Sequence, residues 1–263
     1  YRSDATTFGG VVSGTGALTN RAGTLTLSGT STYSGNTVVA AGTLLVSGSI
    51  GSSAGVTVSG GATLAGAGTV GAVTMASGAT ISPGNTAGVA GTLTVNGAAT
   101  LVGTNVCDIT GTGGTDCDKI AASGAVTASS TLTINLPTSA PAGFSEASAY
   151  TWTIMSGSSA NAANMAIGTK WTTSGTLAVS ASGNTIVVTH TPSAPAAPTG
   201  LSASDGTSTA QVALSWNDVS GETGYVIWRN TVNTFASSAA IYTNAAGAIT
   251  YNGLTSAYSS SVA

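Results

Sequence analysis

The stretch GTLTLSG at residues 23–29 decides the fold, because close variants of it return along the chain. The variants are GTLLVSG at 42–48, GATLAGAG at 61–68, GATISPG at 78–84 and GAATLVG at 97–103, so successive copies begin 19, 19, 17 and 19 residues apart. A period this short is too small for two packed helices. It suits one coil of a parallel β-helix, in which short strands joined by turns stack on the preceding coil.

The residues within the copies favour the same architecture. Threonine alternates with aliphatic residues in TLTL at 24–27 and TLTV at 92–95, which predicts strands with one face turned inward. The pairs Gly35-Asn36 and Gly84-Asn85 suit corners that need positive φ. We therefore expect an all-β protein built on a right-handed parallel β-helix with coils of about 19 residues and a core of stacked aliphatic side chains.

The composition excludes several kinds of partner. Charged residues make up 5% of the chain and the net charge is −3, which does not suit a nucleic-acid partner. The basic residues are scattered: Arg2, Arg21, Lys119, Lys170 and Arg229. The chain contains no run of 18 apolar residues, so we predict no membrane-spanning helix. The opening YRSDATTF is not a signal peptide, and a processed N-terminus would explain it.

Residues 29–103 resemble the autotransporter-associated β-strand repeat family. The pieces that carry the resemblance are TYSGNTVVAAGTLLVSG at 32–48, LAGAGTVG at 64–71 and ISPGNTAGVAGTLTVNG at 81–97. The resemblance extends over residues 9–191, where Asp118 falls at the place of an acid that precedes a returning strand. It implies a parallel β-helix in a secreted or surface-displayed bacterial protein.

A change of composition predicts a second module. The stretch HTPSAPAAPTG at 190–200 is rich in proline and is interpreted as a stiff linker. The residues after it resemble a fibronectin type III module, whose second, third, fifth and sixth strands would be VALSW at 212–216, GYVIWR at 224–229, AITYNGL at 248–254 and YSSSVA at 258–263. We expect a β-helix over 1–191, a linker over 192–198 and, over 199–263, an incomplete immunoglobulin-like sandwich that lacks its last strand.

The missing strand has two explanations. The chain is cut short there, or a neighbouring copy adds a strand to the open edge and so builds a polymer. The edge would be formed by Tyr258, Ser260, Val262 and Ala263. Residues 1–12 are the candidate donor arm, the segment that would add a strand to a neighbouring copy, although they could equally pack on the first coil. The candidate donor residues are Tyr1, Phe8, Val11 and Val12.

The densest group of reactive residues is CDITGTGGTDC at 107–117. Cys107 and Cys117 are predicted to form a disulfide, which implies an oxidising, extracellular setting, and a reduced pair is the alternative. Asp108, Asp116 and Asp118 are a candidate calcium site, although the D-x-D-x-D pattern is absent and solvated acids are the simpler interpretation. The glycines resemble a phosphate loop only weakly, because no helix and no suitably spaced lysine follow.

The rest of the sequence offers few candidate residues for catalysis or ligand binding. His190 is the single histidine and is expected to be a solvated linker residue. Residues 22–107 carry no charged side chain, so we expect no enzyme and no cofactor. Exposed tryptophans could stack on sugars, although Trp216 is expected in the sandwich core and Trp152 at the end of the β-helix.

The sequence thus predicts an extracellular or cell-surface structural protein, the subunit of a filament or stalk that assembles with copies of itself. The alternative is a carbohydrate-binding or adhesin fragment of a larger secreted bacterial protein, with a cell-surface polysaccharide as partner.

Overall fold

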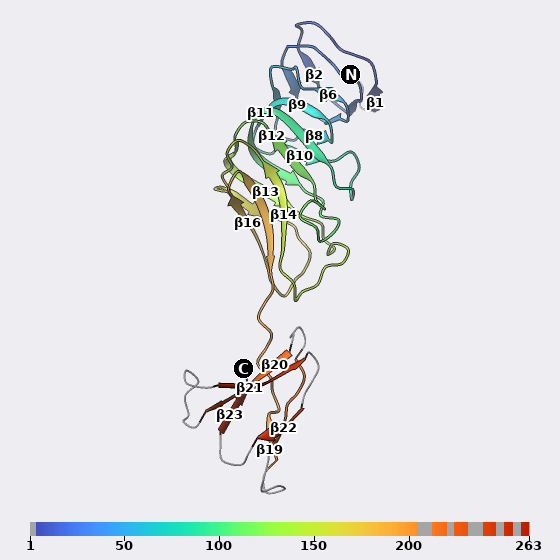
Figure 1. Cartoon of the computed structure of the whole chain (residues 1–263). Helices are drawn as coiled ribbons and strands as arrows, with labels where there is room; N and C mark the ends of the chain where they lie inside the picture. Colours follow the sequence, from blue (N-terminus) through green and yellow to red (C-terminus); the bar gives the residue numbers. More distant parts are fainter. Residues whose placement is uncertain are drawn as a thin grey trace. The chain divides into compact units, whose positions relative to one another are not determined.

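The computed structural model describes residues 4–204, 212–219, 224–230, 239–245, 250–254 and 259–262 (Figure 1). The chain divides into two compact units, residues 1–192 and 193–263. Every regular element in these ranges is a β-strand, which confirms the all-β class. Within the described ranges, no helix is long and apolar enough to cross a membrane.

The first unit is a stack of coils whose strands fall into three columns. The first column is β1 (Ala5–Phe8), β3 (Thr24–Leu27), β5 (Thr43–Val46), β8 (Thr63–Gly66) and β10 (Thr80–Pro83), each paired in parallel with the next. The column continues through the last residues of β11 (Thr92–Val106) and β13 (Val126–Asn135) to β15 (Met165–Ile167). Residues one coil apart in sequence therefore lie side by side, as in a parallel β-helix.

The other two columns complete each coil. One contains β6 (Ser49–Ile50), the start of β9 (Thr69–Met75), the start of β11, β12 (Lys119–Ala122) and the end of β14 (Tyr150–Ser156). The other contains β2 (Leu18–Asn20), β4 (Thr37–Val39), β7 (Val56–Val58), the end of β9, the middle of β11 and the start of β13. The predicted parallel β-helix is thereby confirmed.

The register departs from the sequence repeat after the fourth coil. Thr24 pairs with Thr43 and Thr43 with Thr63, close to the predicted period. Thr80, however, pairs with Thr104. Residues 99–101 of the segment GAATLVG lie in another column, where Ala99 pairs with Val73. The reason is that the connection between β10 and β11 makes an excursion and lengthens the coil.

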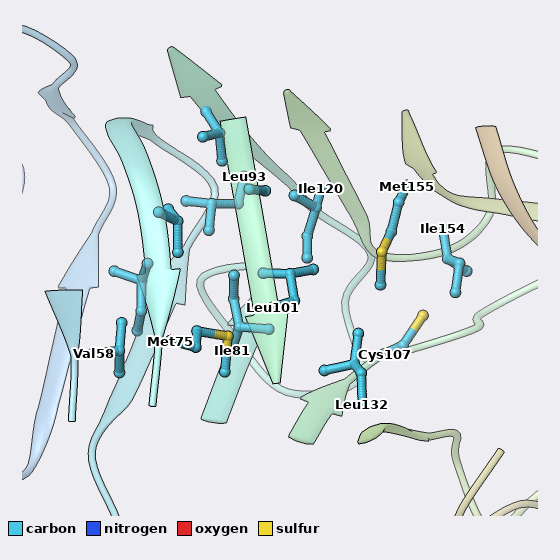
Figure 2. Close-up of a cluster of buried hydrophobic side chains, with 14 of the residues drawn as sticks. Val58, Met75, Ile81, Leu93, Leu101, Cys107, Ile120, Leu132, Ile154 and Met155 are labelled. Atoms are coloured by element: carbon cyan, nitrogen blue, oxygen red, sulfur yellow. The ribbon is translucent and has the colours of Figure 1, made fainter. Parts of the chain in front are cut away.

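Stacked aliphatic side chains form the core, as expected. Leu44, Leu64 and Ile81 face inward at one level of successive coils and are fully buried. Figure 2 shows how the core continues through Leu101 and Ile120 toward the C-terminal end of the stack. Full burial of each such side chain stabilises the folded chain by about 1.5–3 kcal/mol.

Glycine at the corner before the first column is required by the backbone. Gly42 has a φ of 69°, a region that favours glycine, and a Cβ at this position would collide with the carbonyl of Gly23 in the preceding coil. The corresponding glycines Gly23, Gly61, Gly78 and Gly97 also have positive φ, so the recurring glycine of the sequence repeat has a conformational cause.

The C-terminal end of the stack is closed by antiparallel strands. The hairpin of β16 (Thr176–Ser182) and β17 (Thr185–Thr191) pairs through β17 with β14. Pairing therefore changes from parallel to antiparallel at this end of the β-helix.

The described residues of the second unit form two three-stranded antiparallel sheets. One consists of β18 (Ser202–Ala203), β19 (Val212–Ser215) and β22 (Thr250–Leu254), and the other of β21 (Ala239–Ala245), β20 (Gly224–Asn230) and β23 (Ser259–Val262). Leu214, Trp216, Tyr225 and Ile227 form its described core. Trp216 is buried, as predicted from VALSW.

Candidate functional site

The segment CDITGTGGTDC is a short hairpin packed on the β-helix. Ile109 forms an antiparallel bridge with Cys117, and the N–H of Asp118 donates to the carbonyl of Asp108 at 2.8 Å. This register places Cys107 diagonally across from Cys117 rather than opposite it. Diagonal residues in an antiparallel pair lie about 7–8 Å apart, at the limit of what a disulfide spans.

The predicted disulfide is accordingly absent, and both cysteines are free, buried thiols. Burial raises the pKa of the Cys107 thiol well above its ordinary value, and the neighbouring Cys117 and Asp118 add to the effect. Burial likewise raises the pKa of Cys117 to about 11. Because the thiolate is the reactive species, these cysteines behave as small apolar core residues.

The three acids of the hairpin bind backbone N–H groups instead of meeting around an ion. Asp118 is 1% exposed and accepts from Gly91 N at 2.8 Å and Asp108 N at 3.1 Å. Asp108 accepts from Gly88 N at 2.6 Å. Asp116 accepts from Gly113 N at 2.8 Å, inside its own turn. No cluster of three or more metal-ligating side chains occurs in the part of the chain that the structure describes, so the calcium alternative gains no support.

Two of these acids accept hydrogen bonds from the excursion between β10 and β11, which is formed by residues 84–91. Asp108 binds the excursion at Gly88 and Asp118 binds it at Gly91, while the carbonyl of Gly91 accepts from Lys119 N at 2.8 Å. Burial raises the pKa of Asp118 to about 7, against the opposing effect of the two backbone N–H donors. The arrangement is therefore a clamp between two loops that are distant in sequence.

A small groove lies beside this clamp on the outside of the first column. Its volume is about 170 Å³, and Leu45, Ala65, Val106 and Asp108 are part of its lining, together with residues 82–87. A larger pocket of about 420 Å³ lies at the first coil, between β1 and the corner after β2, and contains Asp4 and Arg21. Neither lining contains a histidine or a cysteine.

The tryptophans provide no sugar platform where the structure describes their side chains. Trp152 and Trp171 lie in the closed end of the β-helix, at most 1% exposed, with ring centroids 5.9 Å apart. The indole N–H of Trp152 donates to the Gly111 carbonyl at 2.9 Å, so this ring anchors the hairpin. The side chain of Trp228 lies outside the described residues.

His190 is placed differently from the prediction. The sequence predicts a solvated linker residue, but His190 lies in β17 and is 1% exposed. Nδ1 lies 2.9 Å from the Ser148 carbonyl, and Nε2 lies 2.9 Å from Thr173 Oγ1 and 3.7 Å from Glu146 Oε2. Because these partners are 17 to 44 residues away in sequence, no local motif signals the cluster.

The predicted assembly residues divide between described and undescribed parts. Phe8 ends β1 and pairs with Leu27, so this part of the proposed donor arm is the first strand of the stack, and Val12 N donates to Ser31 Oγ at 3.1 Å. Val11 is 62% exposed. Ser260 and Val262 lie in β23, which pairs with β20. Tyr1, Tyr258 and Ala263 lie outside the described residues.

Comparison with known proteins identifies the kind of repeat. Residues 22–46 match the family model of the passenger-associated-transport-repeat. The match spans β3, β4 and β5, which is one coil and the first strand of the next. The chain therefore contains a repeat of the autotransporter passenger type. No curated protein matches the chain.

Proposed function

We propose that residues 1–192 are a passenger-type structural segment of a secreted or surface-exposed bacterial protein. The observation that carries the proposal is the position of the passenger repeat at 22–46, because it coincides with one coil of a stack that continues in both directions. A stacked β-helix suits display, since each coil binds its neighbours through backbone hydrogen bonds and a shared core.

The chemistry of the stack favours display over catalysis. Residues 22–107 carry no charged side chain and no histidine, so these coils offer no carboxylate, imidazole or amine for acid–base catalysis. The acids that follow, Asp108, Asp116 and Asp118, accept hydrogen bonds from backbone N–H groups. We therefore propose a role without bond-making chemistry and without a cofactor.

Surface accessibility tests this proposal. Antibodies raised against residues 1–192 should label intact bacteria that produce the full protein, or should detect the protein in the culture medium. A cytoplasmic marker in the same cells should stay inaccessible. Labelling that appears only after lysis would contradict export.

A second candidate is self-assembly by strand addition, with copies of the chain as partners. One observation favours it. Among the described residues, β23 is the edge strand of the sheet β21-β20-β23, because it pairs with β20 on one side and with no strand on the other. The two antiparallel sheets are compatible with the resemblance to a fibronectin type III module. A strand from another copy would extend the second sheet beside β23.

Sedimentation velocity of the full chain over a hundredfold range of concentration tests assembly. Strand addition in series predicts a ladder of species that grows with concentration, and a single monomeric species throughout would contradict it. A cell-surface polysaccharide as partner is a separate proposal, tested by retention of the chain on immobilised glycans.

A further inference from the structure

Asn96 and Gly97 stand where β11 passes from one column of the stack to the next. Asn96 pairs with Gly71 of β9, and the pairing of β11 with β9 resumes only at Ala99, after a break in register. Gly97 has a φ of 135°, a value that favours glycine, and Asn96 is exposed. The Asn-Gly dipeptide therefore lies at an exposed corner and not within a regularly paired stretch of strand.

The groups that could react with each other at this corner are held outside the β-ladder. The backbone N–H of Gly97 donates to Oγ of Ser123 at 2.8 Å, so its partner is a side chain. The carboxamide of Asn96 is held weakly, because its Nδ2 lies 3.5 Å from the Gly51 carbonyl, at the outer limit of a hydrogen bond. A bond between Cγ of Asn96 and the nitrogen of Gly97 would close a five-membered ring. Glycine has no side chain to obstruct this approach.

We propose that Asn96 is a site of spontaneous covalent modification, at which the backbone nitrogen of Gly97 attacks Cγ of Asn96. A bond forms between these two atoms, and the bond from Cγ to Nδ2 breaks. The proton of the Gly97 amide leaves with Nδ2 as part of ammonia, so a succinimide remains. Water then adds to one of the two ring carbonyls and opens the ring. Nothing is oxidised or reduced, and water is the co-reactant.

The two ways of opening the ring give different main chains. Water at Cγ yields aspartate, whereas water at the backbone carbonyl yields isoaspartate, whose main chain runs through the former side chain and is one methylene longer. The carbonyl of Val95 accepts from Ser123 N at 2.9 Å, and that of Gly97 accepts from Gly124 N at 2.8 Å. The added methylene falls between these two hydrogen bonds to the next coil, so isoaspartate should loosen the corner.

Peptide mapping of the full chain by mass spectrometry, after warm storage at pH 8, tests the modification. The peptide with Asn96 should gain the mass that exchange of an amide for a carboxyl gives. The exposed Asn184 is the internal control, because the β-branched Thr185 after it hinders the same ring closure and its peptide should stay unchanged. The other Asn-Gly dipeptide, at 252–253, is followed in its own peptide.

A variant and an unfolded sample complete this test. Asn96→Gln should show no gain, since its ring would need six members and closes far more slowly. The rate in the native chain should rise with pH, because the attacking nitrogen must lose its proton. If the urea-unfolded chain gains the mass at Asn96 and the native chain does not, the fold protects the site and the proposal is overturned.

The effect on the corner has its own measurement. Residues 22–107 carry no charged side chain, so the new carboxylate adds a charge that anion exchange can separate. The isoaspartyl fraction should unfold at a lower temperature than the native chain. Asn96→Asp is the matched control, because it carries the charge without the added methylene, and it should unfold close to the native temperature. An isoaspartyl fraction as stable as Asn96→Asp would disprove the loosened corner.

Discussion

Asp118 accepts a hydrogen bond from the N–H of Gly91 at 2.8 Å, although the two residues are 27 positions apart. The carboxylate is buried and accepts a second bond from Asp108 N, so a single side chain ties the hairpin to the excursion after β10. This buried acid makes the stability of the β-helix depend on pH.

The sign of that dependence follows from the pKa of Asp118. Burial raises the pKa to about 7 in the folded chain, above the ordinary value of 3.8, so the folded state binds the proton more tightly. The contribution of Asp118 to stability is thus fully present below about pH 4 and is lost as the pH rises through about 7. Between these pH values the free energy of unfolding should fall by at most about 4 kcal/mol.

Asp118→Asn should remove this part of the pH dependence. The amide cannot ionise, but its one oxygen replaces only one of two acceptors, which costs about 1 kcal/mol at every pH. Urea unfolding at pH 4, 6 and 8 measures the difference between the variant and the native chain. A difference that stays constant over this range would show that Asp118 does not titrate as described.

Gly42→Ala should strongly destabilise the stack. The left-handed backbone conformation costs about 1–2 kcal/mol for an L-residue, and the new Cβ collides with the Gly23 carbonyl, so a total loss of at least about 2 kcal/mol is expected. Gly16→Ala is the control, since a Cβ there meets nothing within 4 Å. Equal thermal midpoints for the two variants would contradict the steric explanation.

The thiols of Cys107 and Cys117 should be unreactive in the native chain. Both are buried with a raised pKa, so an aromatic disulfide reagent at pH 8 should label neither quickly and should label both after unfolding in guanidinium. Mass spectrometry counts the added labels. Failure to label the unfolded, unreduced chain would restore the disulfide that the sequence predicts.

Trp152→Phe should cost more stability than Trp171→Phe. Both rings are buried, but only Trp152 has a described hydrogen bond from its indole N–H, to Gly111 O, whereas Nε1 of Trp171 has no described partner. Losing that bond leaves the Gly111 carbonyl unpaired, which should lower the free energy of unfolding by about 1–3 kcal/mol. Chemical denaturation of the two variants measures the difference, and a smaller loss in Trp152→Phe would disprove the anchoring role.

Much of the first unit could be predicted because its information is local. The recurring Gly-Thr-Leu phrase sets a corner that requires glycine and an alternation that directs Leu44 and Leu64 inward, and coils one period apart then stack. The register after β10 could not be predicted in this way, since the excursion at residues 84–91 shifts most of the next copy into another column.

The sequence by itself thus determined the β-helix, because its period, its corner glycines and its inward aliphatic residues act between neighbouring coils. Only the tertiary structure decided the diagonal register of Cys107 and Cys117, the contact of Asp118 with Gly91 and the burial of His190 beside Glu146. The physical reason is distance along the chain: these groups meet where loops of different coils pack together, and their protonation and reactivity depend on burial that no local pattern encodes.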